Sequence, residues 1–96
     1  MKAIELLDSP EKWTKGHGAV DKTGQAVAHS DAIAVRWCLA GALCKCYPTG
    51  PARDRAVKKL LLAIPKRLAH GGLGNANDAE TTTFGMIRRW LRKAGV

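Results

Sequence analysis

The segment AIAVRWCLAGALCKCY, from Ala32 to Tyr47, is the stretch of the chain that we expect to decide the fold. Its middle, Trp37 to Cys44, has eight consecutive residues without a charge. Arg36 and Lys45, the two charged residues, would lie on opposite faces of a helix, one near each end. We therefore expect a central helix that is buried on nearly every side. The run is too short for a membrane span, which needs about 20 predominantly apolar residues.

Two features of this segment lead to further expectations. Ser30 or Asp31 is the expected N-cap of the helix, because its side-chain oxygen can accept a free backbone N–H of the first turn. Gly41 lies in the helix interior, where glycine costs about 1 kcal/mol relative to alanine. Its presence predicts that another element approaches the backbone closely at this position.

The residues before the segment predict smaller elements. Met1 to Leu7 can form one or two helical turns, and Ser9 can cap a short turn that has Pro10 at its first position. The segment Asp21 to Gly24 is typical of a turn between two short extended runs. We therefore expect a small hairpin, whose strands are His17 to Val20 and Gln25 to Ala28.

The residues after the segment predict two amphipathic helices. The first runs from Pro51 to about Ile64, because apolar residues recur there with the spacing of one helical face, and Pro65 ends it before a last turn from Lys66 to His70. The second runs from about Phe84 to Ala94, with Thr82 or Thr83 as its cap. The region between them, Leu73 to Thr82, is expected to be a surface loop. The predicted class is mainly α, of the α+β type.

Length and composition indicate one domain over residues 1–96. The chain opens without the charged and then apolar pattern of a signal peptide, so a cytoplasmic protein is expected. The net charge is +8, and it is uneven: residues 1–48 hold six Lys and Arg and five Asp and Glu, whereas residues 49–96 hold ten and three. Such asymmetry is typical of proteins that bind nucleic acid or another acidic surface, although it also serves solubility.

The heptad Trp37-Cys38-Leu39-Ala40-Gly41-Ala42-Leu43 resembles a small, functionally uncharacterised domain family of bacterial and phage proteins. That family has a leucine-rich helix, a Trp, a hairpin with an Asp…Gly turn, a Trp-Cys-x-x-Gly-Ala-Leu helix, and an Asn-Asp-Ala segment before a final helix. The corresponding residues here are Ile4 to Leu7, Trp13, Asp21 to Gly24, Trp37 to Leu43, and Asn77-Asp78-Ala79 followed by Thr83. This chain differs in having Ala76 where members commonly have an aromatic residue, and Glu80 where they commonly have proline. The resemblance implies a fold and no known activity.

Basic residues on the two amphipathic helices are the strongest functional signal. The predicted binding residues are Arg55, Lys58, Lys59, Arg88, Arg89, Arg92 and Lys93. Like charges four residues apart repel by a few tenths of a kcal/mol, and an anionic partner would relieve that repulsion. The alternative is a solvated surface, because cations in the last turns of a helix also favour its negative end by about 0.3–1 kcal/mol each.

Other polar and aromatic residues have a structural interpretation beside a functional one. Asn77 and Asp78 form a possible polar loop site, and the alternative is that they cap a turn or satisfy buried backbone groups. The tryptophans could stack on bases, but their spacing places Trp37 and Trp90 in the core, and Trp13 is expected to cover the base of the hairpin.

The three cysteines, Cys38, Cys44 and Cys46, all lie on the expected central helix. Their odd number and helical spacing predict reduced core thiols, and no pair has the CxxC spacing of a structural zinc site. We therefore predict no metal, no cofactor and no catalytic residue.

The leading prediction is a non-enzymatic binding protein that uses its basic helix faces on nucleic acid or on an acidic nucleoprotein. The alternative is a phage-encoded inhibitor that docks on a host protein such as a defence complex. No membrane partner is expected, and the oligomeric state is left open.

Overall fold

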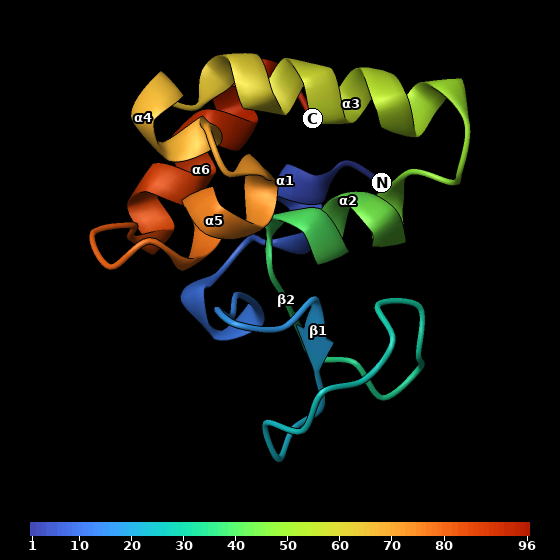
Figure 1. The fold of residues 1–96 in the computed structure, drawn as a ribbon. Helices are drawn as coiled ribbons and strands as arrows, with labels where there is room; N and C mark the ends of the chain where they lie inside the picture. Colours follow the sequence, from blue (N-terminus) through green and yellow to red (C-terminus); the bar gives the residue numbers. More distant parts are fainter.

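The computed structural model describes all residues from Met1 to Val96. In chain order the elements are α1 (Ala3–Leu6), the 3-10 turn η1 (Pro10–Lys12), β1 (Ala19–Val20), β2 (Arg36–Trp37), α2 (Leu39–Cys46), α3 (Pro51–Ala63), α4 (Lys66–Ala69), α5 (Gly72–Asp78) and α6 (Phe84–Ala94). Figure 1 shows α3 across one end of the molecule with α6 passing behind it, and the two strands with their loops at the other end. The predicted class, mainly α with a two-stranded antiparallel sheet, is confirmed.

A hydrophobic core of 18 buried residues joins the two ends of the chain. Leu7 directly after α1, Leu43 of α2 and Leu91 of α6 are at most 1% exposed within it. The backbone N–H of Ile4 donates to the carbonyl of Val96 at 3.2 Å, so the N-terminal helix lies beside the end of the chain. None of the helices combines the length and the apolar character that crossing a membrane would take.

Helix α3 begins at Pro51 as predicted and ends one residue early, at Ala63. Proline suits the first helical position because its missing N–H would have no partner there, and the preceding Gly50 has a φ of 120°, which favours glycine. Its buried residues are Ala56, Leu60 and Ala63, whereas Val57 and Leu61 on the predicted apolar face are only partly buried. The separate turn after Pro65 is also confirmed, as α4.

Helix α6 has the predicted bounds, and both of its ends have a local cause. The Thr83 hydroxyl oxygen accepts the backbone N–H of Met86 at 3.2 Å, as an N-cap does. Gly95 ends the helix in the left-handed conformation, with a φ of 73°. Ile87, Trp90 and Leu91 are its buried residues, and the helix packs against α3.

The central helix is shorter than predicted, and this is the main correction to the fold. Helix α2 spans Leu39–Cys46, whereas Arg36–Trp37 form strand β2 and most residues from Ala32 to Arg36 are exposed. The prediction of burial on nearly every side is therefore wrong for the first part of the segment. A short apolar run is compatible with either a strand or a helix, and here pairing of Trp37 with Ala19 decides for a strand.

The predicted N-caps of this helix are also wrong. The cap is Cys38, whose Sγ accepts the backbone N–H of Gly41 at 3.3 Å. The Asp31 carboxylate instead accepts the N–H of Ile33 at 3.1 Å, which holds a local turn in the loop. Thus a thiol takes the place that a hydroxyl or carboxylate usually has at the start of a helix.

The predicted close approach at Gly41 is confirmed. A Cβ atom on Gly41 would lie 1.9 Å from the carbonyl oxygen of Gly18, so no larger residue fits without moving the backbone. The same Gly18 carbonyl accepts the N–H of Cys38 at 3.1 Å. This contact brings the segment before β1 directly onto the first turn of α2.

The sheet contains the predicted turn but a different second strand. The Asp21 carboxylate accepts the N–H groups of Thr23 and Gln25 at 2.8 and 3.0 Å, which fixes the turn. Strand β1 then pairs antiparallel with β2, in the register Ala19↔Trp37 and Val20↔Arg36. The predicted second run is not a named strand, although it lies beside β1: it makes the isolated bridge Val20↔Ala26, and the backbone N–H of Val27 donates to the carbonyl of Ala19 at 3.1 Å. The strand that pairs with β1 is β2, which lies in the segment that we expected to be helical.

The expected surface loop from Leu73 to Thr82 is largely the helix α5. Its sequence GLGNAND is rich in glycine and asparagine, which have low helix propensity, and this explains the wrong prediction. Tertiary packing overrides that propensity: Leu73, Ala76 and Asn77 are buried.

Candidate functional site

Positive charge is concentrated on three helices, α3, α4 and α6, which we call the basic layer. Together they contain ten Lys and Arg and a single acidic residue, Asp54, for a net charge of +9. The rest of the chain has six basic and seven acidic residues, for a net charge of −1. Essentially the whole excess of positive charge therefore belongs to one part of the fold, the end that α3 crosses in Figure 1.

Most of the predicted binding residues are exposed and have no acidic partner. The exposed members are Arg55, Lys58 and Lys59 on α3 and Arg89, Arg92 and Lys93 on α6. The only salt bridge of the protein joins Lys12 to Asp8 at 3.1 Å, outside the basic layer. These six side chains are thus available to an anion, and several of them are one helical turn apart, where they repel each other.

The position of these residues along their helices separates two interpretations. Helix α6 has Arg92 and Lys93 in its last turn, where cations also stabilise the negative end of the helix. Helix α3 has no basic residue in its last turn, so its cations lack that explanation. The cations of α3 are therefore the clearer sign of an external partner.

Arg88 has a different environment from the other predicted binding residues. Its side chain is half-buried, and Nη1 donates to the backbone carbonyls of Ile4 and Leu7 in and after α1. Arg53 acts similarly at the end of α2, where Nε and Nη2 donate to the carbonyls of Tyr47 and Cys44 at 3.0 and 3.1 Å. Both guanidinium groups are engaged inside the fold, a distinction that helical spacing could not reveal.

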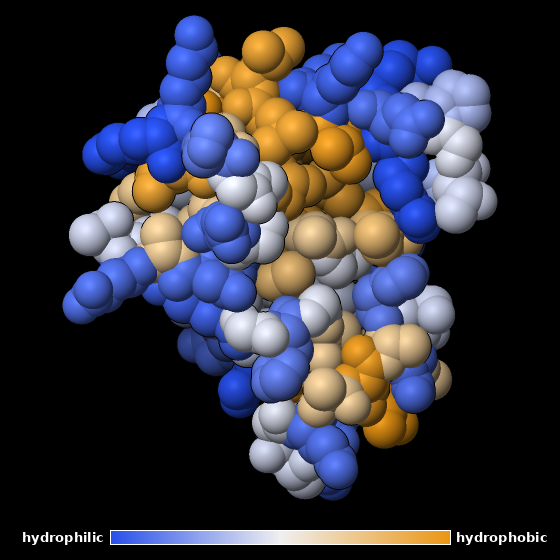
Figure 2. Space-filling model, viewed as in Figure 1, coloured by the Kyte–Doolittle hydropathy of each residue, from blue (hydrophilic) through white to orange (hydrophobic).

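The sequence prediction omitted Lys66 and Arg67, which are exposed on α4 and extend the basic layer. Both residues lie in the basic half of the sequence, which is the observation that could have identified them. They were left out because Pro65 separates them from the first amphipathic helix and the second begins much later. Leu62 is a second omission: it is 85% exposed and follows Lys58 and Lys59 by one turn on the same face of α3. Figure 2 shows hydrophilic side chains on either side of a hydrophobic area over α3.

Asn77 is fully buried and makes four hydrogen bonds. Its Oδ1 accepts Trp13 Nε1 at 2.7 Å and the backbone N–H of Leu39 at 3.0 Å. Its Nδ2 donates to the carbonyl of Thr14 at 3.0 Å and to Asp78 Oδ1 at 2.9 Å. Of the two interpretations of Asn77, satisfying buried polar groups is therefore the one that the geometry shows, and no atom of this side chain is open to a ligand.

Asp78 and its neighbours continue the same contact at the surface. Asp78 Oδ1 accepts the backbone N–H of Gly16 at 2.9 Å, and Lys15 Nζ donates to the carbonyl of Ala79 at 2.8 Å. Lys15 Nζ also lies 5.6 Å from the centre of the Trp13 ring. The Asn-Asp-Ala segment is thus a clamp that fixes the chain around Trp13 to the end of α5.

The three cysteines are free thiols, and their burial differs. Cys38 is buried, as predicted, and burial raises the pKa of its thiol. Cys44 and Cys46 are only partly buried, and burial also raises the pKa of Cys46. No three side chains of the types His, Cys, Asp and Glu converge in a way that could hold a metal ion. A raised pKa favours the neutral thiol over the nucleophilic thiolate.

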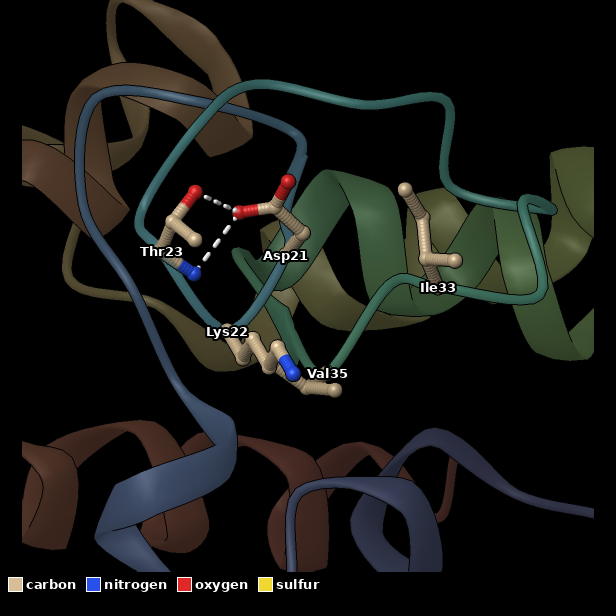
Figure 3. A pocket seen from close by; sticks show the side chains of 5 residues that line it. All are labelled: Asp21, Lys22, Thr23, Ile33 and Val35. Atoms are coloured by element: carbon tan, nitrogen blue, oxygen red, sulfur yellow. Dashed lines mark hydrogen bonds between the residues drawn. The ribbon is translucent and has the colours of Figure 1, made fainter.

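A hollow of about 340 Å³ lies at the other end of the molecule, between the Asp21 turn and the segment before β2. Figure 3 shows its lining residues, Asp21, Lys22, Thr23, Ile33 and Val35. The backbone N–H and the hydroxyl of Thr23 both donate hydrogen bonds to one oxygen of the Asp21 carboxylate. Ile33 and Val35 are 55% and 41% exposed. The Thr23 hydroxyl donates to Asp21 Oδ1 at 2.6 Å, but the same oxygen also accepts the backbone N–H groups of Thr23 and Gln25, so this contact belongs to the turn.

The sequence matches a model of an uncharacterised protein family over nearly its whole length. A family model described as "Family of unknown function (DUF6197)" matches residues 1–95. No curated protein and no solved structure matches the chain. The expected resemblance to an uncharacterised domain family is therefore confirmed, whereas its bacterial and phage context stays a prediction.

Proposed function

This chain belongs to the family of unknown function that matches residues 1–95, and from its own surface we propose that it is a non-enzymatic binding protein whose basic layer holds a nucleic acid, bare or within a nucleoprotein. The binding residues in this proposal are Arg55, Lys58, Lys59, Arg89, Arg92 and Lys93, extended by Lys66 and Arg67. Arg88 is not among them, because its guanidinium donates to the carbonyls of Ile4 and Leu7 within the fold.

The observation that carries this proposal is the separation of charge within the fold. The basic layer has a net charge of +9 and the remainder has −1, and the exposed cations of α3 and α6 form no ion pair. A nucleic acid is the polyanion best suited to such a surface, because each phosphate that a cation neutralises releases condensed counterions. That release is an entropic gain which a single carboxylate on a protein surface does not offer.

The chemistry of the exposed faces supports binding without sequence selectivity. Base edges are read by bidentate Asn and Gln and by Arg, but Arg binds phosphates equally well, so the exposed Arg residues of this surface do not by themselves indicate base readout. The exposed faces of α3 and α6 contain no Asn or Gln. Lys58, Lys59 and Lys93 are point charges that suit phosphates and distinguish bases poorly. We therefore propose that the protein holds the backbone and not a particular sequence.

The remaining polar groups support a function without catalysis. The Asn77 amide is fully used in hydrogen bonds, and the Cys38 thiol caps a helix in the core. The Asp21 carboxylate holds its own turn beside two aliphatic side chains. A reaction would require a nucleophile, a base or a transition-state stabiliser that converge on one cavity.

Binding to mixed-sequence DNA and RNA at about 50 mM salt tests this proposal. With all six exposed cations in contact, log K should fall with log salt at a slope of about −5, since each phosphate contact contributes about −0.9. Absence of binding at about 50 mM salt would refute the proposal.

Leu62 favours a second candidate function, docking on a protein. A leucine that is 85% exposed within a basic face offers an apolar contact that a phosphate backbone does not use. In this alternative the protein is an inhibitor, encoded by a phage, that docks on a host protein. A stoichiometric protein partner that persists in nuclease-treated lysate and is lost with Leu62→Ser would favour it, whereas unchanged capture by Leu62→Ser would count against it.

A further inference from the structure

We infer that the nucleic acid held by the basic layer is double-stranded. This inference rests on the proposed function and specifies the substrate class of the same surface. It follows from where the fold places its aromatic side chains and from the rigidity of the helices that carry the cations.

Proteins that bind single strands usually add stacking on exposed aromatic rings to charge, and each stacked base contributes about 1–3 kcal/mol. This chain has three Trp, one Tyr and one Phe. Trp37 and Trp90 are 7% and 4% exposed, so they belong to the core. Helix α3 contains no aromatic residue at all. The cations of that helix therefore have no stacking platform beside them.

The other aromatic rings are also engaged in the fold. Trp13 donates to Asn77 through Nε1, and its ring centre lies 6.1 Å from that of Phe84. Phe84 and Tyr47 are partly buried and pack against the core. Lys15 Nζ lies 5.6 Å from the centre of the Trp13 ring, where a stacked base would compete with it. The aromatic rings therefore contact other residues of the fold and are not presented as stacking platforms.

What the basic layer does offer is a set of cations on packed helices. Arg55 and Lys59 are one turn apart on α3, as are Arg89 and Lys93 on α6, which corresponds to about 6 Å along each axis. Because α3 and α6 pack against each other, these two rows have a fixed relative position. Such an array suits a regular and stiff arrangement of phosphates.

Two physical terms then favour the duplex. Double-stranded DNA has about one charge per 1.7 Å of axis, and each phosphate contact contributes about −0.9 to the salt slope, compared with about −0.7 for a single strand. A flexible single strand also loses conformational freedom when it is held against a rigid array. In single-strand proteins stacking offsets that loss, and here no exposed ring is present to do so.

Fluorescence anisotropy with a labelled 24-bp mixed-sequence duplex and a labelled 24-nucleotide dT strand tests the inference. At about 50 mM salt we expect the duplex to bind about 10-fold more tightly and with the steeper salt slope. Lys58→Ala/Lys59→Ala should reduce the duplex slope by about 2, because each lysine accounts for about one phosphate contact.

Tryptophan fluorescence gives a second readout. Saturation with dT should leave the emission nearly unchanged, because Trp37 and Trp90 are buried and Trp13 is packed on Phe84. Equal or tighter binding of dT, or strong quenching by it, would overturn the inference while the proposed function stands. Failure of both nucleic acids to bind would overturn the two together.

Discussion

The side-chain oxygen of Asn77 accepts the backbone N–H of Leu39 at 3.0 Å and thereby holds α5 against the first residue of α2. The same oxygen accepts Trp13 Nε1, and the amide nitrogen donates to the carbonyl of Thr14. One buried side chain therefore joins three segments that are distant in the sequence. The resemblance that singled out the Trp, the Trp-Cys-x-x-Gly-Ala-Leu helix and the Asn-Asp-Ala segment has a structural explanation here.

Replacing Asn77 with alanine should destabilise the protein strongly. The substitution would leave the Leu39 amide, the Trp13 indole N–H and the Thr14 carbonyl without their partner, and each unsatisfied buried group costs about 1–3 kcal/mol. We expect the free energy of unfolding to fall by about 3–5 kcal/mol in urea denaturation. Asn75→Ala is the matched control, because Asn75 is exposed on the same helix, and it should change stability by less than about 0.5 kcal/mol. Similar losses for the two variants would contradict the role of Asn77.

The sequence predicted the two helices whose ends are marked by residues that typically start or stop a helix. Pro51 and Thr83 mark the starts of α3 and α6, and the regular apolar spacing of these helices leaves little choice. It failed where tertiary contacts outweigh local preference. Pairing with Ala19 makes Trp37 part of a strand, and burial around Asn77 makes a helix of a glycine-rich segment. Neither contact leaves a periodic signal in the sequence.

Two glycines on helices should respond to alanine in opposite ways. At Gly41 the new Cβ would lie 1.9 Å from the carbonyl oxygen of Gly18, so the backbone must shift, and we expect a loss of at least about 2 kcal/mol. At Gly85 the nearest atom would be Thr83 Oγ1 at 3.8 Å, an ordinary contact. Gly85→Ala should therefore stabilise the protein by about 0.4–1 kcal/mol through helix propensity and chain entropy. Thermal unfolding of both variants checks this, and a stable Gly41→Ala protein would refute the close contact.

Arg88 and Arg89 are adjacent in sequence but should have separate roles. Arg88→Ala removes hydrogen bonds from a guanidinium to the carbonyls of Ile4 and Leu7, so stability should fall by about 1–2 kcal/mol. Arg89→Ala removes an exposed charge, so stability should stay within about 0.5 kcal/mol while the salt slope of duplex binding falls by about 1. Urea denaturation and binding titrations on both proteins distinguish them. A binding loss at Arg88 without a loss of stability would show that the two residues had been assigned the wrong way round.

The cysteine thiols should make the protein less stable in alkali. Burial raises the pKa of the Cys38 thiol, so the folded state keeps this proton at a pH at which the unfolded chain, with a thiol pKa near 8.5, loses it. The stabilisation is complete below about pH 8.5 and is lost as pH rises through the folded-state pKa.

Cys38→Ser isolates this effect. Its hydroxyl can still accept the N–H of Gly41 but does not titrate, so the decline in stability between about pH 8 and 10 should become shallower. Part of the decline should remain, because burial also raises the pKa of Cys46. Urea denaturation across this pH range checks the slope, and an unaltered slope in Cys38→Ser would argue against titration of this thiol.

The candidate site was predicted better as a charge pattern than as a set of side chains. Helical spacing placed Arg55 and Arg89 on solvent-facing arcs correctly, because a regular helix fixes which residues share a face. It could not show that Arg88 reaches the carbonyls of Ile4 and Leu7, because each contact joins residues more than 80 positions apart. Long-range hydrogen bonds of this kind depend on the assembled fold.

Duplex binding by two charge-reversal variants tests the central claim, that the basic layer is the binding surface. Lys58→Glu/Lys59→Glu alters the layer, whereas Lys22→Glu/Arg36→Glu alters exposed residues at the opposite end, and either pair lowers the net charge from +8 to +4. At about 0.1 M salt, charges more than about 10 Å from the contact are screened. We predict that the first variant loses about 100-fold or more in affinity and that the second stays within about fivefold of the parent. Equal losses in the two variants would contradict the claim, because binding would then depend on net charge alone.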